Sequence, residues 1–559
     1  MNIIFEKMTN AHAKDVLDIF NYYIENSFAA YLSTKLPYDF FNKFLEIPNG
    51  FPSYVIKNED TEKVVGFCFL KAYSPFPTFK ETAEITYFIE KDSVGMGIGQ
   101  LALNLLQEEA QKLGVKYLLA SISSKNKQSL KFHAKNGFKE CGSLHNIGKK
   151  KNENFDIVYM EKSLLKFNYA ERMSNLKASE IREMLKITEK PEIISFAGGL
   201  PAPELFPVDA IKKVNRLVLE EDAESALQYS TTEGYDPLRK WCANRMNKRL
   251  GTNFDYENIL ITHGSQQALD LSGKVFLNKD DIVLCESPTY LAAISAFKAY
   301  ECDFIEVPTD DNGMDPHALE NILKTTEKVK LIYVIPEFQN PTGRTWSVER
   351  RKALAELASK YNVIVIEDNP YGELRFEGET LPSVKSFDKS GHILCLGSFS
   401  KIFCPGYRIG WIAGDKEIIR KYVLVKQCTD LQCNTLAQRE ISKYLELYDI
   451  DKHIEKIREV YRERRNLAIE TMEKEFPSEV KFTRPNGGLF MWVEIPKEIN
   501  ANYILEKCLK RNVAFVTGDS FFPNGGHKNT FRLNFSNMPN DRIVKGIKCI
   551  ADVLKEYLL

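Results

Sequence analysis

The stretch SFSKIFCPGYRIGW, residues 398–411, contains the most informative pattern in this chain of 559 residues. Lys401 follows an apolar run that is typical of a buried strand, and a Pro-Gly-x-Arg motif comes after the lysine. A lysine amine can bond covalently to a carbonyl group, while Ser398, Ser400 and Arg408 offer donors that suit a phosphate dianion. The stretch therefore predicts a site for a phosphorylated carbonyl cofactor. The structural alternative is a surface lysine in a turn.

Short apolar runs lie on both sides of this stretch and alternate with longer amphipathic segments. Each run has the length and composition of a buried strand. Alternation of this kind predicts a largely parallel sheet covered by helices. The runs are NILIT (258–262), DIVLCES (281–287), KLIYVI (330–335), NVIVIED (362–368) and HILCLGS (392–398).

Further polar residues fall close to the ends of these runs. Ser265 and Gln266 open a helix after the first run, where a helix N-terminus can hold a second side of a phosphate. Asn340 follows the third run, Asp368 ends the fourth, and Arg532 lies in FRLNFS near the C-terminus. Taken singly, each has a structural explanation, such as a helix cap for Asp368 or a turn for Asn340.

The order and spacing of these motifs resemble those of class I and II aminotransferases of fold type I, which are pyridoxal-phosphate enzymes. The resemblance covers roughly residues 170–559 and is closest to the 2-aminoadipate and kynurenine aminotransferases. It implies that Lys401 binds the cofactor covalently and acts as the base for the 1,3-proton shift. It also implies that Asp368 pairs with the pyridinium nitrogen and that Arg532 clamps the substrate α-carboxylate.

The same resemblance assigns the remaining residues of this site. Tyr229 is implied to reach the phosphate from a second subunit, which makes the expected assembly a homodimer. Gly199 and Arg182 are implied to line the substrate pocket, although an ordinary solvated helix position is an equal alternative for Arg182. The residues implied to contact the cofactor ring or phosphate are Ser265, Gln266, Tyr290, Asn340, Tyr371, Ser398, Ser400 and Arg408.

A second set of motifs lies near the N-terminus. Gly95, Gly97 and Gly99 follow the strand-like run AEITYFI (83–89) and open a predicted helix over residues 100–113. Glycines let backbone N–H groups approach an anion closely, and a helix N-terminus adds partial positive charge. A tight turn without a ligand is the alternative. The segment ISSKNKQSLKFHAKNGFKECG (122–142) follows downstream.

Together these segments resemble the GNAT acetyltransferase superfamily over most of residues 3–164, and phosphinothricin and methionine sulfoximine N-acetyltransferases in particular. The resemblance implies that Gly95, Gly97 and Gly99 hold the pyrophosphate of acetyl-CoA. Asn126 and Ser129 are implied to lie along its pantetheine and adenine.

Two further residues are assigned a chemical role by this resemblance. Glu84 is implied to be the base for the substrate ammonium, because an amine must lose a proton before it attacks a thioester. His133 stands where many members of the superfamily carry a tyrosine that protonates the leaving thiolate; packing or orientation is its alternative role. Val94 departs from the usual Arg or Gln at the start of the glycine loop.

Arginine usage changes along the chain, since no arginine precedes Arg172 and many follow it. Together with the change of motifs, this predicts an N-terminal domain over residues 1–165 and an aminotransferase domain over residues 170–559. The first is expected to be mixed α/β. The second is expected to contain a large domain over about residues 215–450 and a small domain formed by about residues 170–214 and 451–559.

The composition limits the partners and the compartment. With 75 basic and 76 acidic residues, the net charge of -1 gives no global field for nucleic acid or an anionic membrane. The eleven cysteines show no CxxC spacing or Cys/His clustering, so we expect no metal site. The N-terminus lacks a signal-peptide pattern and no segment has 18 uninterrupted apolar residues, which predicts a cytoplasmic protein.

Taken together, the two resemblances imply a bifunctional enzyme that uses pyridoxal phosphate and acetyl-CoA. One part would transfer an amino group between an amino acid and a 2-oxo acid, and the other would acetylate the nitrogen of an amino acid or related amine. One alternative is a pyridoxal-phosphate sensor or regulator with an acetyltransferase output. The other is a pyridoxal-phosphate lyase or decarboxylase, since the same lysine serves those reactions.

Overall fold

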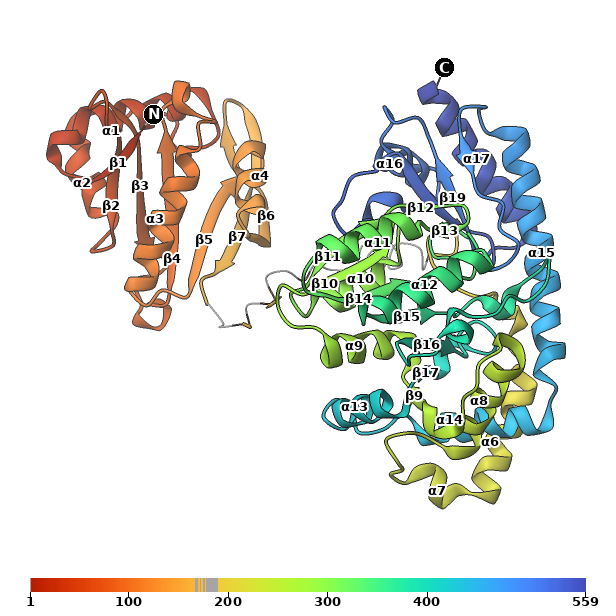
Figure 1. Cartoon of the computed structure of the whole chain (residues 1–559). Helices are drawn as coiled ribbons and strands as arrows, with labels where there is room; N and C mark the ends of the chain where they lie inside the picture. The colour runs from red at the N-terminus through yellow and green to blue at the C-terminus, as the bar shows by residue number, and fades with distance from the viewer. Residues whose placement is uncertain (1, 166–168, 171, 174–175, 177–189, 559) are drawn as a thin grey trace. The chain divides into compact units, whose positions relative to one another are not determined.

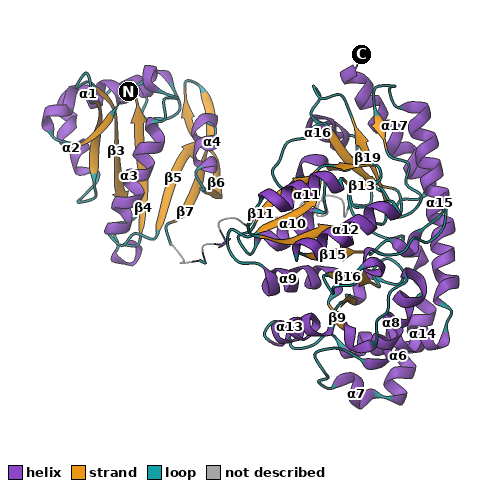
Figure 2. Cartoon of the chain, in the orientation of Figure 1, coloured by secondary structure: helices purple, strands orange, loops and turns teal. Residues whose placement is uncertain are grey.

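The computed structural model describes residues 2–165, 169–170, 172–173, 176 and 190–558. The chain divides into two compact units, Met1–Tyr169 and Ala170–Leu559 (Figure 1). Both units combine sheets with helices, as the sequence predicted (Figure 2). Among the helices of the described part of the chain, none has the length and apolar character needed to cross a membrane.

The first unit is built on a seven-stranded sheet with the strand order β1-β2-β3-β4-β5-β7-β6. Neighbouring strands are antiparallel except β4 and β5, which run parallel. The strands are β1 (Ile3–Lys7), β2 (Ser53–Asn58), β3 (Val64–Ala72), β4 (Thr82–Ile89), β5 (Tyr117–Ser123), β6 (Lys139–Lys150) and β7 (Glu153–Ser163). The α-helices are α1 (Ala13–Asn26), α2 (Phe41–Glu46), α3 (Ile98–Lys112) and α4 (Lys127–Lys135).

Strand β3 is buried on both of its faces. Phe67 and Phe69 pack in a cluster with side chains of α1 and α2, while Cys68 and Leu70 pack in a second cluster with α3. All four side chains are at most 4% exposed. Because successive side chains of a strand point to opposite faces, this continuous apolar run requires helices on both sides of the sheet.

Strands β4 and β5 pair only over a short distance. Their register runs from Thr82 opposite Tyr117 to Glu84 opposite Leu119 and ends there. Strand β4 continues to Ile89 and β5 to Ser123 without further pairing between the two. The sheet therefore opens between the carboxyl ends of its two parallel strands, because β4 and β5 do not pair with each other beyond Glu84 and Leu119.

The second unit contains a seven-stranded sheet with the order β11-β10-β14-β15-β16-β17-β9. Its neighbours are parallel except β17, which is antiparallel to both β16 and β9. The five strands predicted from the apolar runs are all present. The strands are β9 (Ile259–Thr262), β10 (Ile282–Glu286), β11 (Asp303–Val307), β14 (Val329–Val334), β15 (Ile364–Asp368), β16 (Ile393–Ser398) and β17 (Gly410–Ala413).

A smaller sheet of the second unit comes from late in the chain. It has the order β18-β19-β22-β21, with β18 (Lys481–Phe482), β19 (Phe490–Glu494), β21 (Val516–Thr517) and β22 (Thr530–Asn534). Strand β8 (Ile194–Ser195) pairs in parallel with β20 (Val513–Ala514), so the beginning and the end of the unit lie together. Two short strands of two residues each, β12 (Thr309–Asp310) and β13 (Gly313–Met314), form an antiparallel pair.

Among the described residues, the α-helices of the second unit lie between these strands, except the last helix, which follows β22. The α-helices before β16 are α6 (Val208–Glu221), α7 (Ala223–Leu227), α8 (Asp236–Leu250), α9 (Gly264–Phe276), α10 (Leu291–Lys298), α11 (Pro316–Thr325) and α12 (Val348–Tyr361). Those after β17 are α13 (Lys416–Gln427), α14 (Thr435–Leu447), α15 (Ile450–Glu475), α16 (Ala501–Lys510) and α17 (Asn540–Leu558).

Candidate active sites

Lys401 lies three residues after the end of β16, in the turn that the sequence singled out. Its Nζ donates a hydrogen bond of 2.6 Å to the carbonyl oxygen of Gly199. Burial, with the positive charges of Arg532 and Arg408, lowers the pKa of Lys401 to about 8. A substantial fraction of the amine is therefore neutral near physiological pH, and only the neutral amine can attack a carbonyl carbon.

Asp368 is the last residue of β15 and is 2% exposed. Its Oδ2 accepts a hydrogen bond of 2.9 Å from the hydroxyl of Tyr333 on β14. Within the described part of the chain, Oδ1 has no hydrogen-bond partner. Burial raises the pKa of this carboxyl to about 7. A buried carboxylate oxygen without a partner is a place for a cationic N–H group, such as a pyridinium nitrogen.

Arg532 on β22 is 1% exposed and lies with its guanidinium 4.1 Å from the centre of the Phe490 ring. Its Nη1 donates to Oδ1 of Asn340 at 2.7 Å, and its Nη2 donates to the carbonyl of Ala197 at 2.6 Å. Burial lowers the pKa of Arg532 to about 10. Since both partners are neutral, this buried cation is suited to receive a carboxylate from a ligand.

Asn340 connects this arginine to Tyr371, because Nδ2 of Asn340 donates to the Tyr371 hydroxyl at 3.4 Å. Burial raises the pKa of Tyr371, which keeps the hydroxyl protonated. Tyr290, which immediately precedes α10, is half-buried against the core. A side chain added at Gly199 would lie 3.1 Å from the Phe490 ring, so Gly199 keeps the space beside Arg532 open.

The first turn of α9 and the residues around Lys401 form a cluster of hydrogen-bond donors. Gly264 begins α9 with φ +69°, and a side chain there would lie 2.7 Å from Nη2 of Arg408. The Oγ of Ser265 is buried and has no partner among the residues that the structure describes. The backbone N–H of Ser400 donates to Oγ of Ser398 at 3.1 Å. Helix N–H groups, serine hydroxyls and an arginine together fit a phosphate.

Two of the predicted residues lie in more open surroundings. The side chain of Gln266 is exposed, and its Nε2 donates to the carbonyl of Ala292 at 3.4 Å. Tyr229 is 79% exposed. Arg182 lies outside the described residues. Sequence reasoning missed Tyr333 as the partner of Asp368, although its place in the KLIYVI strand puts it on the strand next to β15.

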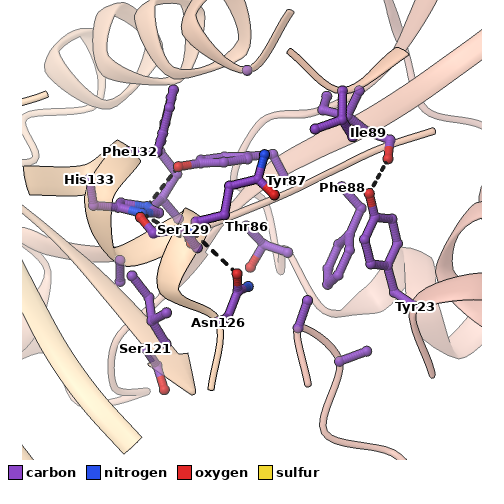
Figure 3. A pocket seen from close by; sticks show the side chains of 18 of the residues that line it. Tyr23, Thr86, Tyr87, Phe88, Ile89, Ser121, Asn126, Ser129, Phe132 and His133 are labelled. Carbon is purple, nitrogen blue, oxygen red and sulfur yellow. Dashed lines mark hydrogen bonds between the residues drawn. The ribbon is translucent and has the colours of Figure 1, made fainter. Parts of the chain in front are cut away.

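In the first unit, a cavity of about 700 Å³ lies at the opening between β4 and β5 (Figure 3). Gly95 and Gly97 border it with φ values of +90° and +83°, in the left-handed region that suits glycine. Asn126 caps α4 through a 3.2 Å hydrogen bond from the N–H of Ser129 to its Oδ1. The other predicted residues that line this cavity are Gly99, Glu84 and His133.

His133 is 4% exposed and uses both ring nitrogens (Figure 3). Its Nδ1 lies 2.8 Å from the carbonyl oxygen of Ser129, and its Nε2 lies 2.6 Å from the hydroxyl of Tyr87. Because a carbonyl only accepts, Nδ1 carries the hydrogen and Nε2 accepts from Tyr87. Burial lowers the pKa of His133, so this neutral form is favoured. Sequence reasoning did not include Tyr87.

Glu84 is ion-paired with a residue that the sequence did not single out. Nζ of Lys71 lies 2.6 Å from Oε2 of Glu84, and both side chains line the cavity. The two residues face each other across the antiparallel β3–β4 pair. Sequence reasoning could have found this ion pair only from the register of β3 and β4, which places Lys71 opposite Glu84.

One cluster with metal-ligand chemistry occurs among the described residues, formed by His263, Asp430 and Cys433. Nζ of Lys426 donates to both carboxylate oxygens of Asp430, at 2.7 and 2.9 Å. His263 Nδ1 also lies 2.9 Å from Asp430. An ammonium group thus already balances the carboxylate, and the cluster is an ion-pair network.

Comparison with known proteins assigns both units to families. Residues 192–550 match the aminotransferase class I and II model, and residues 8–159 match the acetyltransferase (GNAT) domain model. The aromatic-amino-acid aminotransferase 1 of Thermococcus litoralis is 48% identical over 394 residues, which cover 70% of this chain and 94% of that protein. The 2-aminoadipate transaminase of Thermus thermophilus is 42% identical over 68% of this chain and 95% of that protein.

A solved structure gives the same assignment. The kynurenine aminotransferase of Pyrococcus horikoshii, crystallised in complex with PMP, KYN and KYA, is 46% identical, with a TM-score of 0.67 over 70% of this chain and 98% of that chain. The expected fold type and the expected enzyme class are thereby confirmed. The chain belongs to the class I and II aminotransferases, which use pyridoxal phosphate, and it carries an N-terminal GNAT acetyltransferase domain, for which acetyl-CoA is the implied co-substrate.

Proposed function

We propose that this chain is a bifunctional enzyme. Its second unit transfers an amino group between an amino acid and a 2-oxo acid, and its first unit acetylates the nitrogen of an amino acid or related amine. The observation that carries the first activity is a pair of buried charged side chains with unpartnered atoms among the described residues, namely Oδ1 of Asp368 and Nε of Arg532, whose guanidinium has only neutral acceptors. The first fits a protonated ring nitrogen and the second fits a substrate carboxylate.

Each residue of the second unit has a role that its surroundings support. Pyridoxal phosphate, when bound, supplies a carbonyl that accepts the amino group and a ring that withdraws electrons. Lys401, with a pKa of about 8, holds the cofactor and moves the proton at the substrate α-carbon. Arg532 orients the substrate through its α-carboxylate, and Asp368 keeps the ring nitrogen protonated. Asn340, Tyr371 and Tyr290 position the ring, while Ser265, Gln266, Ser398, Ser400 and Arg408 hold the phosphate.

The amino donor belongs to the range of substrates that the relatives' names cover. Those names specify aromatic amino acids, 2-aminoadipate and kynurenine. All three share an α-amino acid group and carry a large side chain, for which Gly199 leaves space beside Phe490. Arg182 is the proposed partner of an acidic side chain.

In the first unit, the backbone around Gly95, Gly97 and Gly99 binds the pyrophosphate of acetyl-CoA, and Asn126 and Ser129 border its pantetheine. Glu84 binds the substrate ammonium and favours its deprotonation close to the thioester. Nε2 of His133 accepts the hydrogen bond from the Tyr87 hydroxyl, so the proton between these two side chains resides on Tyr87. We therefore assign proton donation toward the leaving thiolate to Tyr87 and a positioning role to His133.

The domain limits and the assembly are part of the same proposal. Residues 1–165 form the acetyltransferase, and residues 170–559 form the aminotransferase, with a large domain over about residues 215–450 and a small domain from the two flanking segments. The pairing of β8 with β20 supports a small domain built from both ends. The exposed Tyr229 supports a homodimer in which this residue reaches the partner's phosphate. We propose a cytoplasmic location and no nucleic-acid or membrane partner.

The decisive experiment is a visible spectrum of the purified protein during titration with single amino acids. Loss of the absorption of the lysine-bound cofactor, reversed by a 2-oxo acid, is the expected result and identifies the donor class. The Lys401→Ala variant serves as the control, because it lacks the covalent attachment. If the cofactor is bound and no amino acid changes its spectrum, the sensor alternative replaces transamination. Release of carbon dioxide or ammonia from the amino acid would favour the lyase alternative.

A further inference from the structure

The ion pair between Lys71 and Glu84 lies where the sheet of the first unit opens. Glu84 occupies the last paired position between β4 and β5, beyond which the cavity separates the two strands. Nζ of Lys71 and Oε2 of Glu84 are 2.6 Å apart, and their side chains are 36% and 20% exposed. Two opposite charges are thus presented together to a ligand in the cavity, close to the site proposed for the thioester.

Among the described residues that line this cavity, the lysines are Lys71 and Lys135. Lys135 belongs to α4, the helix of His133. Lys71 is therefore the cation beside Glu84 on the β3–β4 pair. A simple amine that paired with Glu84 would leave the ammonium of Lys71 without its partner, whereas a ligand that also carries a carboxylate would satisfy both charges.

The face of the β3–β4 pair that carries this ion pair becomes aromatic along its length. Residues two apart on a strand share a face, and the register places Phe69 opposite Thr86 and Phe67 opposite Phe88 on the same face as Lys71 and Glu84. Phe88 packs against Phe20 of α1 at 5.0 Å between ring centres.

The cavity lining continues this aromatic surface beyond the strands. The aromatic residues that border the cavity on the side of α1 and α2 are Phe20, Tyr23, Tyr31, Phe44, Phe69 and Phe88. The hydroxyl of Tyr31 donates to the carbonyl of Ser121 on β5 at 2.9 Å, so this lining residue is held against β5. The cavity lining thus combines the Lys71–Glu84 ion pair with an aromatic surface on the side of α1 and α2.

We propose that the acetyl acceptor is an α-amino acid with an aromatic or other large apolar side chain. On binding, the substrate separates the ion pair: Lys71 pairs with its carboxylate and Glu84 with its ammonium. The two charges of an α-amino acid lie on one carbon, which matches two protein charges that are in direct contact. The side chain then lies along Phe69, Phe88 and Phe44. This inference rests on the proposed acetyl transfer and specifies its substrate.

In the transfer itself, the amine nitrogen, after losing a proton toward Glu84, attacks the carbonyl carbon of the thioester. A C–N bond forms, the C–S bond breaks, and the thiolate takes a proton from the side of Tyr87. The products are an N-acetyl amino acid and the free thiol of coenzyme A, so no oxidant or reductant takes part.

The test measures N-acetyl product by mass spectrometry with the full chain, acetyl-CoA and no 2-oxo acid. The acceptors are L-phenylalanine, phenethylamine, which lacks only the carboxylate, and L-alanine, which lacks only the ring. We expect kcat/KM for L-phenylalanine to exceed that for either other acceptor by at least about tenfold. Lys71→Met should lower kcat/KM for L-phenylalanine at least about tenfold and leave that for phenethylamine within about threefold.

Two variants control for a general effect of removing a charge. Lys71→Arg keeps the cation and should retain most of the preference for L-phenylalanine. Lys63 forms a comparable 2.6 Å ion pair with Glu90 outside the cavity lining, so Lys63→Met should behave as the wild type. Equal losses for L-phenylalanine and phenethylamine in Lys71→Met, or no preference in the wild type, would overturn this inference alone. Absence of product with every amine would overturn the acetyl transfer and this inference together.

Discussion

Nη1 of Arg532 donates a 2.7 Å hydrogen bond to Oδ1 of Asn340, although 192 residues separate them in the sequence. The bond joins the proposed carboxylate clamp to a residue proposed to contact the cofactor ring. Since the acceptor is a neutral amide, the guanidinium keeps its full charge for a ligand. A carboxylate in place of the Asn340 amide would compete with the substrate carboxylate for the guanidinium of Arg532.

Asn340→Asp should therefore weaken binding of the amino acid much more than Asn340→Ala. The introduced carboxylate would pair with Arg532, and displacing a buried ion pair costs on the order of 2–5 kcal/mol. We expect the apparent KM for the amino donor to rise at least about tenfold in Asn340→Asp relative to Asn340→Ala. Steady-state kinetics of both variants measures this. Equal KM values would show that the substrate carboxylate binds elsewhere.

The pKa of Lys401 predicts how cofactor capture depends on pH. Burial lowers this pKa from its usual 10.5 to about 8, so the reactive neutral amine appears as pH rises through 8. The rate of cofactor binding to the cofactor-free chain should rise about tenfold per pH unit below pH 7 and level off above pH 8 to 9. Stopped-flow absorbance measures it. A rate that still climbs tenfold per unit at pH 10 would contradict the lowered pKa.

Asp368→Asn should stabilise the cofactor-free chain at high pH while it weakens cofactor binding. The pKa of Asp368 is raised to about 7 in the folded chain, so burying its charge destabilises the folded state as pH rises from 4 to 7. Asparagine removes this penalty, which is at most about 4 kcal/mol. Urea unfolding of both cofactor-free proteins at pH 4.5 and 8 gives the comparison. A stability difference that does not grow with pH would contradict the prediction.

Tyr87→Phe should reduce kcat of acetyl transfer by about a hundredfold if Tyr87 supplies the proton for the leaving thiolate. The ring remains, so we expect the free energy of unfolding to change by only about 1 kcal/mol. Tyr54→Phe provides the matched control, since the Tyr54 ring packs in the same unit beside Glu109 and outside the cavity lining. An unchanged kcat in Tyr87→Phe would show that the Tyr87–His133 hydrogen bond has only a structural role.

Local pattern was sufficient to predict five strands of the larger sheet of the second unit and the polar residues near their ends. Asp368 ends one apolar run and Lys401 lies three residues after the end of another, so their places could be read from the order of the chain. The predicted helix over residues 100–113 begins two residues earlier, at Ile98, because Gly97 already adopts the left-handed conformation that starts the turn.

What the sequence did not reveal depends on register and on side-chain contact between distant segments. Lys71 faces Glu84 only because β3 and β4 pair in one particular register, and a shift by one residue would point the lysine to the other face. Tyr87 meets His133 only because α4 packs beside β4. Likewise, the bond of Tyr333 to Asp368 depends on the order of strands in the sheet.

The pairing of β8 with β20 has a consequence for how the protein is made. Ile194 contacts a strand partner, Val513, that leaves the ribosome more than three hundred residues later. The β8–β20 pair of the second unit can therefore form only after residues 513 and 514 have been synthesised. Every strand of the acetyltransferase unit lies before residue 164, so that unit can fold during translation. A premature stop before Val513 would thus release a chain with a complete first unit and a second unit that lacks this strand pair.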